Sequence, residues 1–266
     1  MPDEAVAARP TAPRPLGELL SASMNMFVDG WPRFGAVLAV GVLPGALAMT
    51  ALMAFHGYAD KEAVKSAIMS RAWGPLASLL AVGGAAAALK ALATLALILV
   101  VDGFDRNQDV ALGEAYRRAA GLFGPFFLTM VLVTIWVAGG TLLLIIPGVI
   151  LAIRFSLAHV AVALEEVSGS AALDRSKELV VAHMGKVVGN CFVMAVITTL
   201  IAVILGVALN LGGAFFKDIP FMPDILKILT RFLGELVNAW YVAFYVLLFK
   251  DIAALHPRDA AGQSPA

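Results

Sequence analysis

Two long apolar runs, separated by a proline–glycine dipeptide, are the most informative part of this sequence for its fold. Residues 125–146 read PFFLTMVLVTIWVAGGTLLLII, Pro147-Gly148 follow, and residues 149–164 read VILAIRFSLAHVAVAL. A helix needs roughly 20 predominantly apolar residues to cross a bilayer. The two runs therefore predict two membrane-spanning helices with a turn at Pro147-Gly148. An ordinary helical hairpin fits this pattern, and so does a re-entrant or broken helix that lines a cavity.

Four further apolar runs have the same character, at about 34–55, 76–101, 187–215 and 225–249. The runs are continuous, whereas the strands of a membrane β-barrel alternate in polarity. The chain is 61% hydrophobic and 14% charged, and a typical soluble domain is about 45–50% apolar and about 25% charged. We therefore expect an all-α membrane protein with six transmembrane helices.

The loop charges predict the orientation, because cytoplasmic loops carry an excess of Lys and Arg. With the N-terminus inside, eleven such residues fall on the inner side and four on the outer side. This count predicts that both termini are cytoplasmic. The inner residues are Arg9, Arg14, Arg33, Arg106, Arg117, Arg118, Arg175, Lys177, Lys186, Lys250 and Arg258, and the outer ones are Lys61, Lys65, Arg71 and Lys217.

The predicted domain organisation is one helical membrane domain, residues 15–250, between two disordered cytoplasmic tails, residues 1–14 and 251–266. The N-terminal tail has no apolar core, so it does not read as a signal peptide. A single cysteine, Cys191, excludes an intrachain disulfide. The formal net charge is +0 without a clustered basic face, which argues against a nucleic-acid partner.

Three polar segments that precede apolar runs resemble one another. They begin at Leu16-Gly17-Glu18, Leu112-Gly113-Glu114 and Leu173-Asp174-Arg175. In the second and third copies a glycine follows the leucine by 12 positions, about three helical turns. Each segment is amphipathic, as expected for a helix that lies in the membrane interface near anionic headgroups. We therefore expect three hairpins, each preceded by a cytoplasmic interfacial helix.

A family resemblance rests on residues 146–180, which read IPGVILAIRFSLAHVAVALEEVSGSAALDRSKELV. The features are the Pro147-Gly148 pair, Arg154 soon after it, an acidic end to the run at Glu165-Glu166, and Arg175-Ser176 at the start of the next amphipathic helix. With Leu16-Gly17-Glu18, this pattern resembles the glycerophosphoryl diester phosphodiesterase membrane-domain family and related bacterial inner-membrane proteins of unknown function. The resemblance implies a membrane domain in the cell inner membrane, and it does not imply phosphodiesterase activity.

Charged side chains inside the apolar runs are the first candidate functional residues, because each costs about 2.5–3.5 kcal/mol at the centre of a span. Glu235 is expected to pair with Lys90 or Arg154, and Arg231 lies four residues before Glu235. A buried ion-pair cluster that fixes helix packing explains these residues, and so does a polar path for a proton, ion or lipid headgroup. The candidate intramembrane polar cluster comprises Lys90, Arg154, His159, Arg231 and Glu235.

Two further sets are predicted on similar grounds. A candidate cytoplasmic interface cluster comprises Glu165, Glu166, Arg175, Ser176 and Lys177, which suits a salt-bridge cluster or a docking site for lipid or a partner. Close helix contact is expected at Gly41 and Gly45, a GxxxG match, and at Pro147 and Gly148. The histidines His56, His159, His183 and His256 are too scattered in sequence to predict a metal site.

No nucleotide-binding, metalloprotease or nucleophile-elbow motif stands in the chain, so we expect neither an enzyme nor a cofactor. The first functional expectation is an inner-membrane protein that organises or supports a membrane process. The alternative is a small transporter or lipid-handling protein with a polar cavity near Lys90, Arg154 and Glu235. The expected partners are the lipid bilayer, anionic headgroups, and other membrane proteins or a second copy of the chain.

Overall fold

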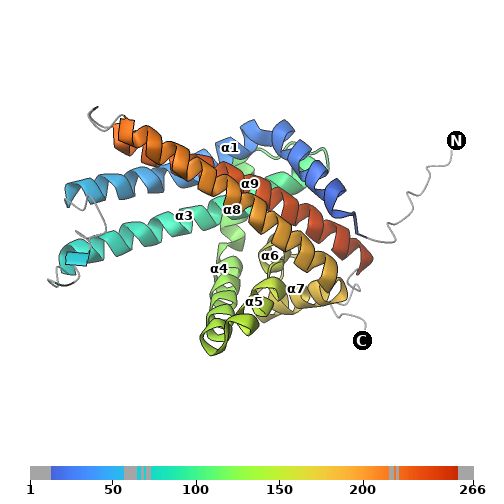
Figure 1. Ribbon diagram of the computed structural model, residues 1–266. Helices are drawn as coiled ribbons and strands as arrows, with labels where there is room; N and C mark the ends of the chain where they lie inside the picture. The colour runs from blue at the N-terminus through green and yellow to red at the C-terminus, as the bar shows by residue number, and fades with distance from the viewer. Residues whose placement is uncertain are drawn as a thin grey trace. The chain divides into compact units, whose positions relative to one another are not determined.

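The computed structural model describes residues 13–56, 65–66, 69, 73–215, 219 and 222–256. These residues form helices and no strands (Figure 1). The outer parts of both predicted tails, residues 1–12 and 257–266, lie outside the described residues, as do most of the predicted outer cations. The helices are α1 (Leu16–Phe55), α3 (Trp73–Asp105), α4 (Leu112–Leu143), α5 (Ile145–Arg154), α6 (Ala158–Glu165), α7 (Ser170–Ala182), α8 (Met184–Phe215) and α9 (Met222–Leu255).

Within the described residues, six helical stretches are long and apolar enough to cross a membrane, and α5 and α6 together make one of them. Large apolar side chains such as Leu142, Phe192 and Ile204 are exposed on these stretches. Water would penalise such surfaces, whereas the hydrocarbon of a bilayer does not. The chain is therefore an all-α, multi-pass membrane protein, as the apolar runs predict.

The chain divides into two compact units. Unit 1 contains residues 1–28, 124–193 and 243–266, and unit 2 contains residues 29–123 and 194–242. Helices α1, α4, α8 and α9 each contribute residues to both units.

The core of unit 1 forms where α6 and α7 pack with the last part of α9. Leu157, Leu179, Phe244 and Leu247 are almost completely buried there. The N-terminal segment joins the same unit, because the guanidinium of Arg14 donates to the carboxylate of Asp251 at 2.7–3.0 Å. Helix α9 continues to Leu255. The prediction of a disordered tail from residue 251 is therefore wrong for residues 251–255, which extend the apolar helix by more than a turn.

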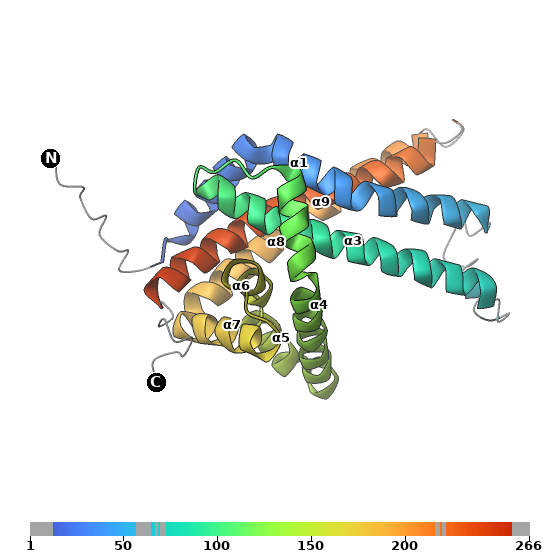
Figure 2. The ribbon, with the colours of Figure 1, turned by 180° about the vertical axis from the view of Figure 1, so that it is seen from behind.

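In unit 2, α1 and α3 run side by side (Figures 1 and 2). A methyl group at Gly41 would overlap the side chain of Ala93, and one at Gly45 would lie 2.8 Å from the Cβ of Ala86. The prediction of close helix contact at Gly41 and Gly45 is confirmed. The hydroxyl of Tyr116 on α4 donates to the carbonyl of Val37 on α1 at 2.7 Å, which fixes a third helix against this pair.

The predicted turn at Pro147-Gly148 is wrong. Both residues lie inside α5, and the break between α4 and α5 falls at Leu144, which has an extended backbone. Proline is tolerated here because the first turn of a helix has no intrahelical acceptor for its N–H groups. Gly148 instead permits close approach, since a methyl group there would overlap Thr141 on α4.

The fourth span is broken into two helices at residues 155–157. Ser176 of α7 stabilises this break, because its hydroxyl donates to the carbonyl of Arg154 at 2.7 Å and accepts the N–H of Leu157 at 3.2 Å. Backbone groups that the break leaves without helical partners are thereby satisfied. The sequence pattern places a possible break at Pro147-Gly148 and not at residues 155–157, so this break is a finding of the structure.

From the sequence we expect an interfacial amphipathic helix before each hairpin, and in the structure only the third of these segments forms a helix of its own. Helices α1 and α4 run without interruption through the expected junctions, although they contain Pro32 and Pro125. A proline removes one backbone hydrogen bond and can bend a helix without ending it. Of the three, only α7 is a helix of its own; it ends at Ala182, and His183 separates it from α8.

Candidate functional site

A charged pair lies within the helices of unit 2. The ammonium of Lys90 on α3 donates to Oε1 of Glu235 on α9 at 2.5 Å. The expectation that Glu235 pairs with Lys90 or Arg154 is therefore confirmed for Lys90. The Lys90 side chain is 53% exposed and that of Glu235 only 14%. The cation of the pair is thus open to a further ligand, whereas the carboxylate is largely covered.

The second oxygen of Glu235 has its own partner. The side-chain amide of Asn238, one turn further along α9, donates to Oε2 at 3.3 Å. Glu235 is thus held from both sides. The spacing also allowed a pair with Arg231 within α9, but no Arg231–Glu235 ion pair is found in the described part of the chain, where Glu235 contacts Lys90.

A groove of about 490 Å³ passes this pair, and we call it the charged groove. Its volume falls in the range of roughly 300–1,000 Å³ that is usual for ligand pockets. The groove exists because the residues of α1 and α3 that line it are mostly small. Two methionines with flexible side chains lie beside it. The apolar lining comprises Val42, Gly45, Ala46, Met49, Met53, Gly83, Ala86, Ala87 and Gly234, and the polar lining comprises Lys90, Thr230, Arg231 and Glu235.

A second groove, of about 340 Å³, follows along α9 between α8 and α9. We call it the hydroxyl groove, because none of the described side chains that line it is charged. It shares Gly234 with the charged groove. Its lining comprises Thr198, Thr199, Ala202, Gly234, Val237, Asn238 and Tyr241.

The structure assigns the five residues of the predicted intramembrane cluster to different units. Lys90, Arg231 and Glu235 line the charged groove of unit 2. Arg154 and His159 belong to unit 1, where the ring of His159 lies 6.0 Å from that of Tyr245 between centroids. The Nε atom of Arg154 is buried and has no hydrogen-bond partner in the described residues.

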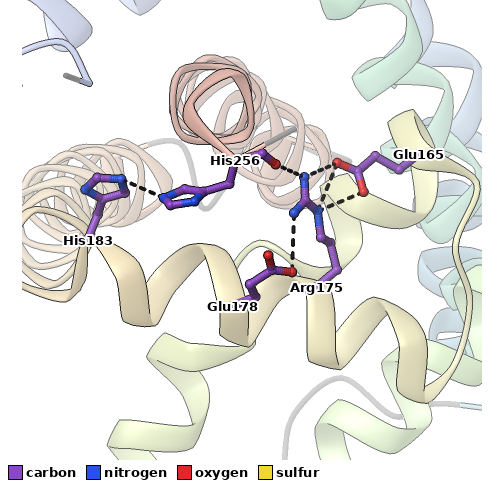
Figure 3. Close-up of polar contacts among 5 residues, drawn as sticks. All are labelled: Glu165, Arg175, Glu178, His183 and His256. Carbon is purple, nitrogen blue, oxygen red and sulfur yellow. Dashed lines mark hydrogen bonds and ion pairs between the residues drawn. The ribbon is translucent and has the colours of Figure 1, made fainter. Parts of the chain in front are cut away.

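The predicted interface cluster of unit 1 contains a strong ion pair (Figure 3). Arg175, whose side chain is only 4% exposed, donates from two nitrogens to Glu165 at 3.0 Å and from a third to Glu178 at 3.3 Å. It also donates to the backbone carbonyl of His256 at 2.9 Å. One guanidinium therefore joins α6, α7 and the end of α9.

The other members of this cluster do not share that site. Ser176 is completely buried, which corrects its assignment to an interface, because its hydroxyl is used at the α5–α6 break. Glu166 and Lys177 are exposed. Glu166 ends α6 with a φ of 54°, in the left-handed region that favours glycine.

Two histidines that no sequence pattern connects lie together beside Arg175 (Figure 3). The Nε2 atoms of His183 and His256 are 3.2 Å apart. Burial lowers the pKa of His183, and the positive charges of His256 and Lys186 lower it further. No group of three or more His, Cys, Asp or Glu side chains that could hold a metal ion occurs in the described ranges.

Comparison of the chain with protein families, with curated protein sequences and with solved structures finds no match.

Proposed function

We propose that this multi-pass membrane protein is a lipid-handling protein that binds a lipid with a phosphate headgroup in the charged groove. The observation that carries the proposal is the composition of the groove wall. Lys90 and Arg231 provide two cations against one carboxylate, that of Glu235, and the rest of the wall is mainly apolar. A lipid offers the complementary pattern, an anionic head joined to apolar chains.

The exposure of the charged residues supports an anion rather than a cation as ligand. Glu235 already accepts from Lys90 and from Asn238, so it has little capacity left for a cationic group. Lys90 has three donors, of which Glu235 uses one. A phosphate oxygen can accept from the remaining donors, and charge-assisted hydrogen bonds of this kind are the stronger ones. Charged residues within a span are commonly functional, because burying them in lipid is costly.

The membrane setting of this proposal follows the sequence. The Lys and Arg count favours two cytoplasmic termini, and the resemblance to the glycerophosphoryl diester phosphodiesterase membrane-domain family favours an inner membrane. The contact between Arg14 and Asp251 supports termini on one side, because it ties the chain before α1 to the last turns of α9. An arrangement of three hairpins accords with both arguments. None of these residues suggests catalysis.

Binding to nanodiscs tests the proposal. The full chain is placed in phosphatidylcholine nanodiscs, and the binding of phosphatidic acid is measured by native mass spectrometry. We expect Lys90→Gln and Arg231→Gln each to weaken binding several-fold. Lys177→Gln, which removes an exposed cation from unit 1, serves as the matched control and should bind as the wild type does.

Three results would contradict lipid handling. Equal binding of phosphatidic acid by wild type and both groove variants would leave the groove without a role. An equal loss in Lys177→Gln would indicate attraction to the protein surface in general. Displacement of the lipid by inorganic phosphate at the same concentration would indicate a site for free anions. The first expectation, a protein that organises a membrane process, predicts instead that partners copurify in mild detergent while lipid binding is unselective.

A further inference from the structure

The two grooves of unit 2 follow one another along α9. The charged groove is lined by α9 residues from Thr230 to Glu235, and the hydroxyl groove by residues from Gly234 to Tyr241. At 1.5 Å per residue, Thr230 and Tyr241 lie about 16 Å apart along the helix. Gly234 lines both grooves and has open space where a Cβ would lie. A ligand that passes Gly234 therefore meets the side chains of both grooves.

The two grooves differ in what they can bind. Lys90 and Arg231 in the charged groove are donors, so they suit the oxygens of a phosphate. The hydroxyl groove provides neutral groups, and at least two of its side chains can accept a hydrogen bond. Thr198 donates its hydroxyl hydrogen to the carbonyl of Met194 at 2.8 Å, which leaves its oxygen as an acceptor.

Asn238 provides the second acceptor. Because its amide nitrogen donates to Glu235 at 3.3 Å, its carbonyl oxygen points away from that carboxylate. Oxygen acceptors repel a phosphate and attract a donor. The donor that suits them is a hydroxyl rather than an ammonium, because none of the described residues of this groove carries a negative charge that would stabilise a cation.

Resting on the proposed function, we propose that the lipid bound by the charged groove carries a hydroxylated headgroup, and that the hydroxyl groove binds those hydroxyls. The phosphate lies at Lys90 and Arg231. The hydroxyls donate to Thr198 and Asn238 beyond Gly234. The hydroxyl groove thus selects among anionic lipids, while the charged groove selects anionic over neutral lipids.

The test compares three lipids with the same acyl chains in phosphatidylcholine nanodiscs. Phosphatidylglycerol carries hydroxyls beyond its phosphate, phosphatidic acid carries none, and phosphatidylethanolamine carries an ammonium. At a mildly acidic pH, where each phosphate carries one negative charge, two neutral hydrogen bonds of ordinary net strength predict that phosphatidylglycerol binds roughly thirtyfold more tightly than phosphatidic acid. Phosphatidylethanolamine should bind more weakly than phosphatidylglycerol.

The variants locate this selectivity. Thr198→Val keeps the shape of the side chain and removes its oxygen, and Ala202→Leu fills the hydroxyl groove without a polar change. Thr198→Val removes one of the two hydrogen bonds, so it should lower the preference for phosphatidylglycerol roughly fivefold, and Ala202→Leu should lower it towards onefold. Both variants should leave the affinity for phosphatidic acid unchanged. Val207→Leu on α8, a residue outside the lining of the hydroxyl groove, is the control for added volume.

The possible outcomes separate the two proposals. If the wild type binds phosphatidic acid no better than phosphatidylcholine, the proposed function fails. If it binds phosphatidic acid well and phosphatidylglycerol no better, only the assignment of the hydroxyl groove fails. A preference for phosphatidylethanolamine, or a preference for phosphatidylglycerol that is undiminished in both variants, would also overturn that assignment.

Discussion

The imidazoles of His183 and His256 meet at 3.2 Å between their Nε2 atoms, although 73 positions separate them in sequence. The contact joins the junction of α7 and α8 to the end of α9. One ring must donate and the other accept, so the bond requires at least one neutral imidazole. Protonation of both rings would leave two donors face to face.

This contact predicts that acid destabilises the protein. Burial holds the pKa of His183 below its ordinary value of 6.5 in the folded chain, with the charges of His256 and Lys186 as additional causes. The unfolded chain then binds more protons between the two values, so stability rises with pH there. The contribution of neutral His183 to the free energy of unfolding is complete above about pH 6.5. It is lost as the pH falls through the lower pKa that His183 has in the folded chain.

Thermal unfolding in detergent between pH 8 and pH 5 measures this effect. The melting temperature of the wild type should fall on acidification, and that of His183→Gln should fall less. Lys177→Gln should keep the wild-type slope. Identical slopes for wild type and His183→Gln would show that the histidine pair does not contribute to the pH dependence.

Replacing Arg175 should be severely destabilising. Arg175→Ala removes the bidentate ion pair with Glu165 and the hydrogen bond to the backbone carbonyl of His256. Breaking a buried ion pair costs about 3–5 kcal/mol. Denaturant unfolding should show a loss of this size, whereas the neighbouring exposed Lys177→Ala should change stability by less than about 0.5 kcal/mol. Similar losses in the two variants would contradict the geometry of Figure 3.

Gly169 is a position that only glycine tolerates well. Its φ of 59° and ψ of −131° are unfavourable for other residues, and its N–H donates to the hydroxyl of Thr129 at 2.9 Å. Gly169→Ala should cost about 1–3 kcal/mol through backbone strain. Gly121→Ala is the control, because Gly121 is inside α4 with open space around it, and alanine there should be neutral or stabilising. A harmless Gly169→Ala would show that the turn before α7 can adopt another conformation.

The close contact between α1 and α3 predicts that a second substitution can restore part of the stability lost in a first one. A methyl group at Gly41 would overlap Ala93, so Gly41→Ala should destabilise the protein by about 1–3 kcal/mol. Gly41 also faces the hydroxyl of Tyr116, so the double variant Gly41→Ala/Ala93→Gly should recover part of the loss rather than all of it. Gly84→Ala on α3 has open space and should have little effect. Additive losses in the double variant would argue against direct contact.

The sequence predicts the membrane class, and it predicts that Glu235 pairs with a cation of another span, because both follow from local and costly features. It leaves Lys90 and Arg154 open as the partner, and the structure shows Lys90. The six long apolar runs expose more apolar surface than a water-soluble fold can cover, so they indicate a bilayer. A carboxylate within such a run is costly unless a cation lies beside it. The helix ends were less predictable. Pro147 resembles a turn residue, but the first turn of a helix tolerates it, and the break at residues 155–157 depends on Ser176 from another helix.

The histidine pair could not be predicted, since neither its spacing nor its surroundings in sequence connect the end of α9 to the start of α8. The same holds for the hydroxyl groove. Thr198 and Asn238 are ordinary residues of two apolar helices, and only the packing of α8 on α9 brings them to one groove. A charged residue within an apolar run can be recognised from the sequence because its burial is costly. A groove of neutral polar side chains can be recognised only once the structure shows which residues face one another.

The glycine contact between α1 and α3 also bears on how fast the proposed lipid could enter and leave the charged groove. At Gly41 and Gly45 the backbones of α1 and α3 approach closely, and Gly45 also lines the charged groove. Because the two helices are tightly packed there, we expect this side of the groove to be rigid. Met49 and Met53 on the same groove have freely rotating side chains. Rotamer changes take picoseconds to nanoseconds, whereas movements of whole helices take microseconds or longer. For the proposed lipid ligand, we therefore expect rotation of these two methionine side chains, rather than movement of α1 against α3, to set the rate of entry into the charged groove.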